Sequence, residues 1–284
     1  MPNIRDTRKR IRTVENIKRI TSALEKIAAA RLFRAKNVLS NARPYQAALE
    51  RVTQDLLNSQ PEAAHPLLAG NRSGCALVVA VTSDRGFCGG YNTAAIEAAV
   101  SVAEKLGREN VKFIVFGKKG ADYLDRRGYL TLARYINLPA SLPAALVDEV
   151  AERAADLHRR GETGQTHLVM TEFVSMAKHV PRVKRVLPVE RVPDPGRNYM
   201  NYAYEPGPGR TLEAILPRLV AATIWAGVLE SAVSEHAERM FMMQRATKNT
   251  DDLIAWLTLV MNKARQAMIT RELTDIVGAA ETIA

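Results

Sequence analysis

Apolar residues near the N-terminus recur at intervals of three and four along the chain. The recurring positions are Ile4, Ile11, Val14, Ile17, Ile20, Leu24 and Ile27. Because no glycine or proline interrupts the stretch from Asn3 to Arg43, the pattern predicts one long helix. Pro44 falls inside the pattern, which then resumes, so we expect a kink there and an end of the helix near Pro61.

The period changes between Cys75 and Pro193. Three short runs, CALVVAVT, VKFIVFG and THLVMTEFV, are rich in valine, isoleucine and phenylalanine and alternate with helix-compatible stretches. This alternation predicts a mostly parallel, Rossmann-like sheet. The run RVKRVLPVERV contains Pro188 and is more typical of an edge strand or hairpin arm, and VPDPGRNYMNYAYEPGPG after it is expected to be a linker.

A heptad repeat occupies the last part of the chain. Its a positions are Leu219, Ala226, Val233, Met240, Thr247, Ile254, Met261 and Met268. Its d positions are Ala222, Leu229, His236, Met243, Thr250, Leu257 and Ala264. Most of these side chains are apolar, which predicts one helix of about 60 residues, roughly 90 Å long.

A helix of that length needs a second helix along its apolar seam, and the N-terminal helix is the candidate. Since a folded segment separates the two, they must run antiparallel. We therefore expect an α/β protein with a long antiparallel two-helix coiled coil and a central Rossmann-like α/β domain. The expected divisions are residues 1–60 for the first helix, 74–195 for the α/β domain and 210–284 for the last helix.

Positive charge is concentrated in the first helix. Residues 1–57 hold 13 Lys+Arg and 5 Asp+Glu, a net +8 out of +10 for the whole chain. This excess indicates either a solvated helical face or an acidic partner. Nucleic-acid binding is a weaker alternative, because the helix has few interleaved aromatic residues, only Phe33 and Tyr45.

Several other classes of protein are disfavoured. The basic N-terminus is not followed by an apolar signal region, and no window approaches 18 uninterrupted apolar residues, so we expect neither secretion nor a membrane span. Cys75 and Cys88 lack further ligands at zinc spacing, and two cysteines make no disulfide scaffold. We expect no metal and no cofactor.

The glycine-rich loop VTSDRGFCGGYN follows the first predicted strand, where such loops cradle phosphates. It matches neither GxxxxGK[ST] nor GxGxxG, so we expect a structural turn in which Asp84 pairs locally with Arg85. A nucleotide-binding enzyme remains an alternative. If Cys88 were a nucleophile, it would need a base, and no histidine is nearby in the sequence. A histidine could still lie close to it in the folded chain; the candidates are His65, His158, His167 and His179. His236, at a d position, is more typical of register or partner contact than of catalysis.

Two stretches, TSDRGFCGGYN at 82–92 and NKARQAMITRELTDIV at 262–277, resemble signatures of the gamma subunit of F-type ATP synthases. KRITSALEKIAAARLFRAK, ARPY, YAYEP and SEHAERM resemble the same family in the same order. The resemblance extends over essentially the whole chain. It implies an antiparallel coiled coil and a Rossmann-like domain, in agreement with the periodicities.

The resemblance also implies a function. Gamma subunits form a non-catalytic central stalk that turns inside a ring of alpha and beta subunits and couples ion flow to ATP synthesis or hydrolysis. Its foot meets the epsilon subunit and the c ring. The implied location is peripheral, on the cytoplasmic face of a bacterial cell membrane, with no nucleic-acid partner.

Individual positions match family contact residues. Those matching contacts to the beta subunit are Arg265, Gln266 and Thr270 at a catch loop, Arg239 at acidic loops, and Leu24, where a methionine is common. Those matching contacts of the foot with the c ring and epsilon are Tyr202, Tyr204 and Glu205.

Overall fold

The computed structural model describes residues 3–60, 62–70, 74–138, 143–176, 178–193, 204–205 and 207–283, with side chains as far as residue 277. The chain forms two compact units. One consists of Met1–Ala28 with Met240–Ala284, and the other of Ala29–Arg239.

Two long helices are confirmed. Helix α1 extends over Ile4–Ser59 and continues through Pro44, as expected. Helix α5 extends over Pro208–Ile283, and its 76 residues make the expected length of about 60 wrong. It is longer because it begins before Pro217 and continues across it. Leu216 and Val220, on either side of this proline, are buried, and their packing stabilises the helical path.

The second unit contains a five-stranded sheet with the order β3-β2-β1-β4-β5. The strands are β1 (Ala76–Val81), β2 (Val111–Phe116), β3 (Leu130–Tyr135), β4 (Gln165–Ser175) and β5 (Lys178–Leu187). Strand β1 pairs in parallel with β2 and β4, and β2 with β3, whereas β5 pairs antiparallel with β4 at the edge. The mostly parallel sheet and the hairpin arm are thus confirmed. Strand β3 was not predicted, because an edge strand that is largely half-exposed has no continuous apolar run.

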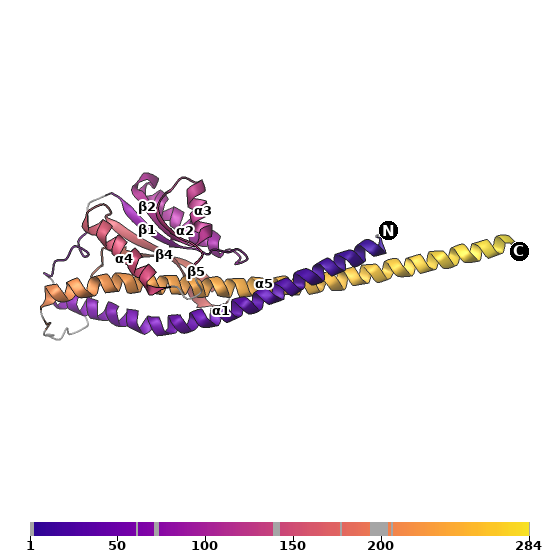
Figure 1. Ribbon diagram of the computed structural model, residues 1–284, viewed down its shortest axis with the longest axis horizontal. Helices are drawn as coiled ribbons and strands as arrows, with labels where there is room; N and C mark the ends of the chain where they lie inside the picture. The colour runs from indigo at the N-terminus through magenta and orange to yellow at the C-terminus, as the bar shows by residue number, and fades with distance from the viewer. Residues whose placement is uncertain are drawn as a thin grey trace. The chain divides into compact units, whose positions relative to one another are not determined.

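The connecting helices cover both faces of the sheet (Figure 1). They are α2 (Tyr91–Leu106), the short 3-10 turn η1 (Arg108–Asn110), α3 (Lys118–Arg126) and α4 (Ala144–Arg159). Along β1, Ala76, Val78 and Ala80 pack on the face covered by α2 and α3, with Ala99 and Leu124. Because successive side chains of a strand point to opposite faces of the sheet, the apolar residues of β1 contribute to a separate hydrophobic core on each face.

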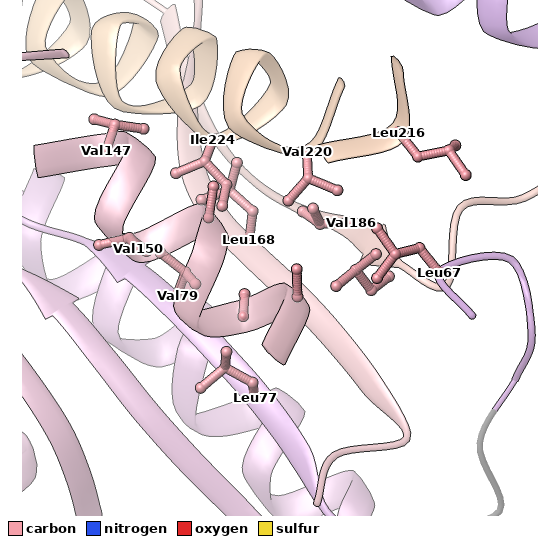
Figure 2. Close-up of a cluster of buried hydrophobic side chains, with 14 of the residues drawn as sticks. Leu67, Leu77, Val79, Val147, Val150, Leu168, Val186, Leu216, Val220 and Ile224 are labelled. Carbon is pink, nitrogen blue, oxygen red and sulfur yellow. The ribbon is translucent and has the colours of Figure 1, made fainter. Parts of the chain in front are cut away.

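The opposite face is covered by α4 and by the first part of α5. Leu77 and Val79 of β1 pack in one cluster with Val150 of α4 and with Val220 and Ile224 of α5. Figure 2 shows these side chains converging from the strands and both helices. This packing fixes the first part of α5 against the sheet.

Helix α5 approaches β4 closely at Gly227. A Cβ atom at this position would lie 2.5 Å from Leu168 Cδ2 and 2.9 Å from Met170 Sδ. Glycine is therefore required here for close helix-to-strand packing rather than for a turn.

In the first unit, α1 and α5 pair antiparallel. Lys18 Nζ lies 2.5 Å from Asp251 Oδ1, and Thr247 Oγ1 lies 2.9 Å from Thr21 Oγ1. Residue numbers thus rise along one helix as they fall along the other. In the first unit the predicted a and d side chains from Met240 to Ala264 are buried or half-buried, whereas Met268, the last predicted a position, is exposed.

Within the described residues, α5 is the one helix that contains a stretch long and apolar enough to cross a membrane. The stretch lies within Pro208–Val277, has a mean hydropathy of 1.6, and is 56% buried inside the protein. Its apolar composition is accounted for by the core that α5 forms with the sheet.

Candidate functional site: the glycine-rich loop and the end of α5

The glycine-rich loop, residues 82–90, connects β1 to α2 at the carboxyl end of the sheet. The strand order reverses beside β1, between its neighbours β2 and β4. Doubly wound sheets bind their ligands at such a switch point. The contacts of the loop therefore decide whether it can hold a phosphate.

Asp84 occupies the amide groups that a phosphate would need. Its carboxylate accepts hydrogen bonds from the backbone N–H of Lys118 at 2.9 Å and of Leu138 at 3.0 Å. Lys118 is the first residue of α3, so the carboxylate lies where the helix dipole favours negative charge. The expected pairing of Asp84 with Arg85 is wrong, because two backbone N–H groups bind the carboxylate instead.

Cys88 lies in a polar network on the other side of the loop. Asn92 Oδ1 accepts a hydrogen bond from Ser83 N at 2.9 Å, and Asn92 Nδ2 lies 3.1 Å from Cys88 Sγ. The thiol is 2% exposed, and burial raises its pKa above the ordinary value. Its hydrogen-bond partners in the described part of the chain include no histidine. The environment favours a protonated, structural thiol over a nucleophile.

Arg239 of α5 holds the loop from outside. Its Nε donates to the Gly86 carbonyl at 3.2 Å, and its Nη2 donates to the Arg85 carbonyl at 3.1 Å. Its Nη1 lies 2.5 Å from Glu235 Oε1. These contacts fix the segment before Phe87, whose φ of 63° is uncommon for a residue with a side chain. Phe87 is thereby held with its ring 72% exposed.

The ionisable neighbours of Arg239 share one environment. Burial raises the pKa of Glu235, against the lowering effect of the Arg239 charge. Burial, and then the charges of Arg239 and Arg31, lower the pKa of His236 to about 4. His236 is therefore neutral at physiological pH, and its Nδ1, 3.3 Å from Arg239 Nη1, accepts rather than forming an ion pair with Glu235. The expected role of His236 in setting register or contacting a partner stays a prediction. Within the chain, the structure gives this histidine a contact with Arg239.

Arg265, Gln266 and Thr270 lie on the exposed surface of α5. Thr270 Oγ1 donates to the Gln266 carbonyl at 3.0 Å, as in many helices. Extending the register set by Lys18 and Asp251 to the first residue of α1 reaches about residue 265. These three residues thus begin the part of α5 that has no α1 beside it.

Exposed apolar side chains are also present on both helices of the first unit, and the heptad pattern alone did not identify them as exposed. The exposed ones on α5 are Leu253, Trp256, Leu259, Met268, Ile269, Leu273, Ile276 and Val277. On α1 they are Ile17, Ile20 and Ile27. Met268 is a predicted a position, and the three isoleucines belong to the apolar repeat that predicted the first helix, so exposure of these four was not expected. The other exposed apolar residues of α5 lie outside its a and d positions, which is a signal that the sequence contains. Exposed large apolar side chains in this number are typical of a protein interaction site.

The remaining predicted contact residues lie elsewhere. Leu24 is half-buried on α1. Tyr204 is half-buried, and its hydroxyl lies 3.0 Å from Ser59 Oγ at the end of α1, while Glu205 is exposed. Tyr202 lies outside the described residues. Arg239 is directed at the glycine-rich loop, so a partner would reach it at the side of this loop.

Comparison with known proteins gives one consistent result. The ATP synthase family model matches residues 3–283. The ATP synthase gamma chain of Pelotomaculum thermopropionicum is 34% identical over 284 residues, covering 100% of both chains. The gamma chain of Symbiobacterium thermophilum is 36% identical, covering 99% of this chain and 98% of its own.

Solved structures agree at the level of fold. A chain of the Euglena gracilis mitochondrial ATP synthase, described as OSCP/F1/c-ring, aligns with a TM-score of 0.71 at 17% identity, covering 99% of this chain and 94% of its own. A chain of the Tetrahymena thermophila central stalk and c ring aligns with a TM-score of 0.62 at 22% identity, covering 80% and 99%. Because the family model covers residues 3–283 and both relatives match over essentially their whole length, the chain belongs to the family of ATP synthase gamma chains.

Proposed function

We propose that this chain is the rotating central-stalk subunit of an F-type ATP synthase. It couples ion flow through a membrane c ring to ATP synthesis, or the reverse, at the beta subunits. The observation that carries the proposal is the full-length match to gamma chains. The chain itself performs no catalysis, and the phosphate-binding positions of its loop are used by its own groups.

The exposed surface of α1 and α5 in the first unit supports a role inside a surrounding ring. Its apolar side chains need a partner to cover them, and α5 continues past the start of α1. A rotating contact must be renewed at each step. Small residues and screened charges suit such a contact better than deep interlocking, which would hold one orientation. The net +8 of residues 1–57 suits acidic loops on the ring.

The proposed partners are the alpha and beta subunits, the epsilon subunit and the c ring. Arg265, Gln266 and Thr270 would bind the catch loop of beta, and Arg239 and Leu24 would face other beta loops. A second group would contact the c ring and epsilon, namely Tyr202, Tyr204 and Glu205. The proposed location is the cytoplasmic face of a bacterial membrane, where the chain is held peripherally by the complex.

A reconstitution experiment tests the proposed beta contact. Arg265→Ala with Gln266→Ala should lower both the yield of assembled complex and its ATPase activity, because the catch loop loses its hydrogen-bond partners. Lys248→Ala with Asn249→Ala is a matched control, since both residues are exposed on the same helix. Wild-type assembly and activity in the first variant would remove the proposed contact.

The enzyme alternative has its own test. Titration of the purified chain with labelled ATP and magnesium should show no saturable binding, because Asp84 occupies the start of α3. A micromolar, magnesium-dependent site would restore the alternative. Tight and strongly salt-dependent DNA binding would do the same for the nucleic-acid alternative.

A further inference from the structure

A hollow lies in the second unit where α1, α4 and the first part of α5 meet. Its volume is about 480 Å³. This is within the range of small-molecule sites in proteins, roughly 300 to 1,000 Å³. None of the residues that line it belongs to the glycine-rich loop or to the predicted beta contacts.

Small side chains create the hollow. Ala42, Ala144, Ala221 and Ala222 line it, one or two from each of the three helices. Larger residues at these positions would fill the space. Val147 of α4 also lines the hollow; it is 1% exposed and belongs to the hydrophobic core shown in Figure 2.

Two aromatic side chains flank the space. Tyr45 comes from α1 and Trp225 from α5. Tyr45 is 57% exposed, whereas Trp225 packs partly against the core. Aromatic side chains that line one hollow offer surfaces on which a planar ring can stack.

The charged lining residues make no internal pairs. Among the described residues, Arg218 and Asp148 form neither a hydrogen bond nor an ion pair. Ala144, the first residue of α4, adds the positive end of a helix dipole to the rim. Positive charge from Arg218 and the helix end outweighs the one carboxylate, so an anion is favoured over a cation.

We propose that this hollow binds an aromatic organic anion, whose ring lies between Tyr45 and Trp225 and whose carboxylate or sulfonate pairs with Arg218. This site is separate from the stalk function and goes beyond it. Because it joins α1, α4 and α5 in one unit, a bound ligand would stabilise their packing.

Fluorescence of the full-length chain tests the site with 8-anilinonaphthalene-1-sulfonate as the probe. The chain has two tryptophans, so Trp256→Phe leaves Trp225 as the only donor for energy transfer. Titration of this variant should give saturable transfer with one probe per chain. The reverse variant, Trp225→Phe, reports probe bound near Trp256 on the exposed surface of the first unit.

Substitutions made in the Trp256→Phe background separate the site from non-specific binding. Arg218→Gln should weaken binding about tenfold through loss of a charge-assisted contact. Asp148→Asn should tighten it about threefold by removing a repulsive charge. Ala221→Phe should abolish it by filling the hollow. Arg210→Gln, at an exposed position of α5 outside the hollow, should leave the affinity unchanged.

Three results would overturn the proposal. One is the absence of saturable transfer from Trp225. Another is an equal response of Arg218→Gln and Arg210→Gln. The third is unchanged binding in Ala221→Phe while circular dichroism shows that this variant is folded.

Discussion

At the scale of single residues, Arg239 makes the contacts that connect the glycine-rich loop to α5. It joins two carbonyls of the glycine-rich loop to Glu235 and His236 on α5. The loop is thus held by hydrogen bonds from α5 as well as by its connection to the sheet. The motif resembles a phosphate-binding loop in the sequence, but here it connects the sheet to α5. We call the contacts of Arg239 with the Arg85 and Gly86 carbonyls the latch.

Removing this guanidinium should destabilise the chain strongly. Arg239→Ala leaves the largely buried Glu235, whose side chain is 17% exposed, without its ion-pair partner. Breaking a fully buried pair costs about 3–5 kcal/mol, so we expect a loss somewhat below this range. Urea unfolding of the purified chain measures this loss. Arg245→Ala, an exposed arginine of the same helix, should cost less than about 1 kcal/mol. Equal midpoints for the two variants would show that the latch contributes nothing to stability.

His236 should make stability depend on pH. Its folded pKa of about 4 lies below the unfolded value of 6.5, so the unfolded chain binds the proton more readily between these values. Its contribution is present above pH 6.5 and is lost as pH falls towards 4, by roughly 3 kcal/mol in total.

The control for this effect is His236→Asn, which cannot titrate. The raised pKa of Glu235 acts in the opposite direction, so the difference between wild type and variant isolates the histidine. Between pH 7 and pH 4, the stability of the wild type should fall by roughly 3 kcal/mol relative to that of the variant. A constant difference across this range would contradict the assignment.

Residue roles were only partly predictable. The position of the glycine-rich loop after β1 followed from the sequence, and so did its mismatch to nucleotide motifs. The partners of Asp84 did not, because Lys118 and Leu138 are brought to it by the parallel crossovers of the sheet. Side-chain pairing across such distances depends on tertiary contacts that local spacing does not contain.

At the scale of elements, periodicity identified α1, α5 and the buried strands. Their apolar repeats are long or continuous, so the packing they require is visible in the sequence. Strand β3 was not predicted, because its edge position leaves it half-exposed and without a continuous apolar run. The length of α5 was underestimated because Pro217 lies inside the helix rather than before it.

The two faces of α5 in the first unit should differ sharply in their contribution to stability. Leu257 is 6% exposed at a d position of the seam, whereas Leu259 is 52% exposed. Leu257→Ala should lower the stability of the helix pair by about 2–3 kcal/mol, and Leu259→Ala by less than about 0.5 kcal/mol.

Hydrogen exchange of the amides of residues 240–270 measures this difference locally. Faster exchange confined to Leu257→Ala is expected for the isolated chain. In an assembled complex, Leu259→Ala should instead weaken association, since its side chain would contact the ring. Equal protection in both isolated variants would contradict the seam assignment.

At the scale of the whole molecule, each compact unit has its own proposed task. The first presents an exposed apolar and polar surface, on which the beta contacts are proposed. The second contains the sheet, the latched loop and the proposed anion site. The three-part division into a first helix (1–60), an α/β domain (74–195) and a last helix (210–284) stays a prediction.

Family membership and fold could be predicted from the sequence, whereas the hollow and the exposed apolar face could not. The motifs at 82–92 and 262–277 indicated the family, which the full-length matches confirm. The motifs contain some of the residues involved, such as Tyr45 at the hollow and Ile269 on the exposed face, but they did not indicate that these side chains would be left uncovered. The hollow and the exposed face both depend on which helix faces are left uncovered after packing.

Rotation tests the central claim most directly. A bead attached through Lys105→Cys, an exposed position of α2, in a Cys75→Ser background would report the motion of the chain in a reconstituted complex with alpha and beta subunits. On addition of ATP, the account predicts unidirectional, stepwise rotation of the bead. A complex that assembles and hydrolyses ATP while the bead stays stationary would contradict it.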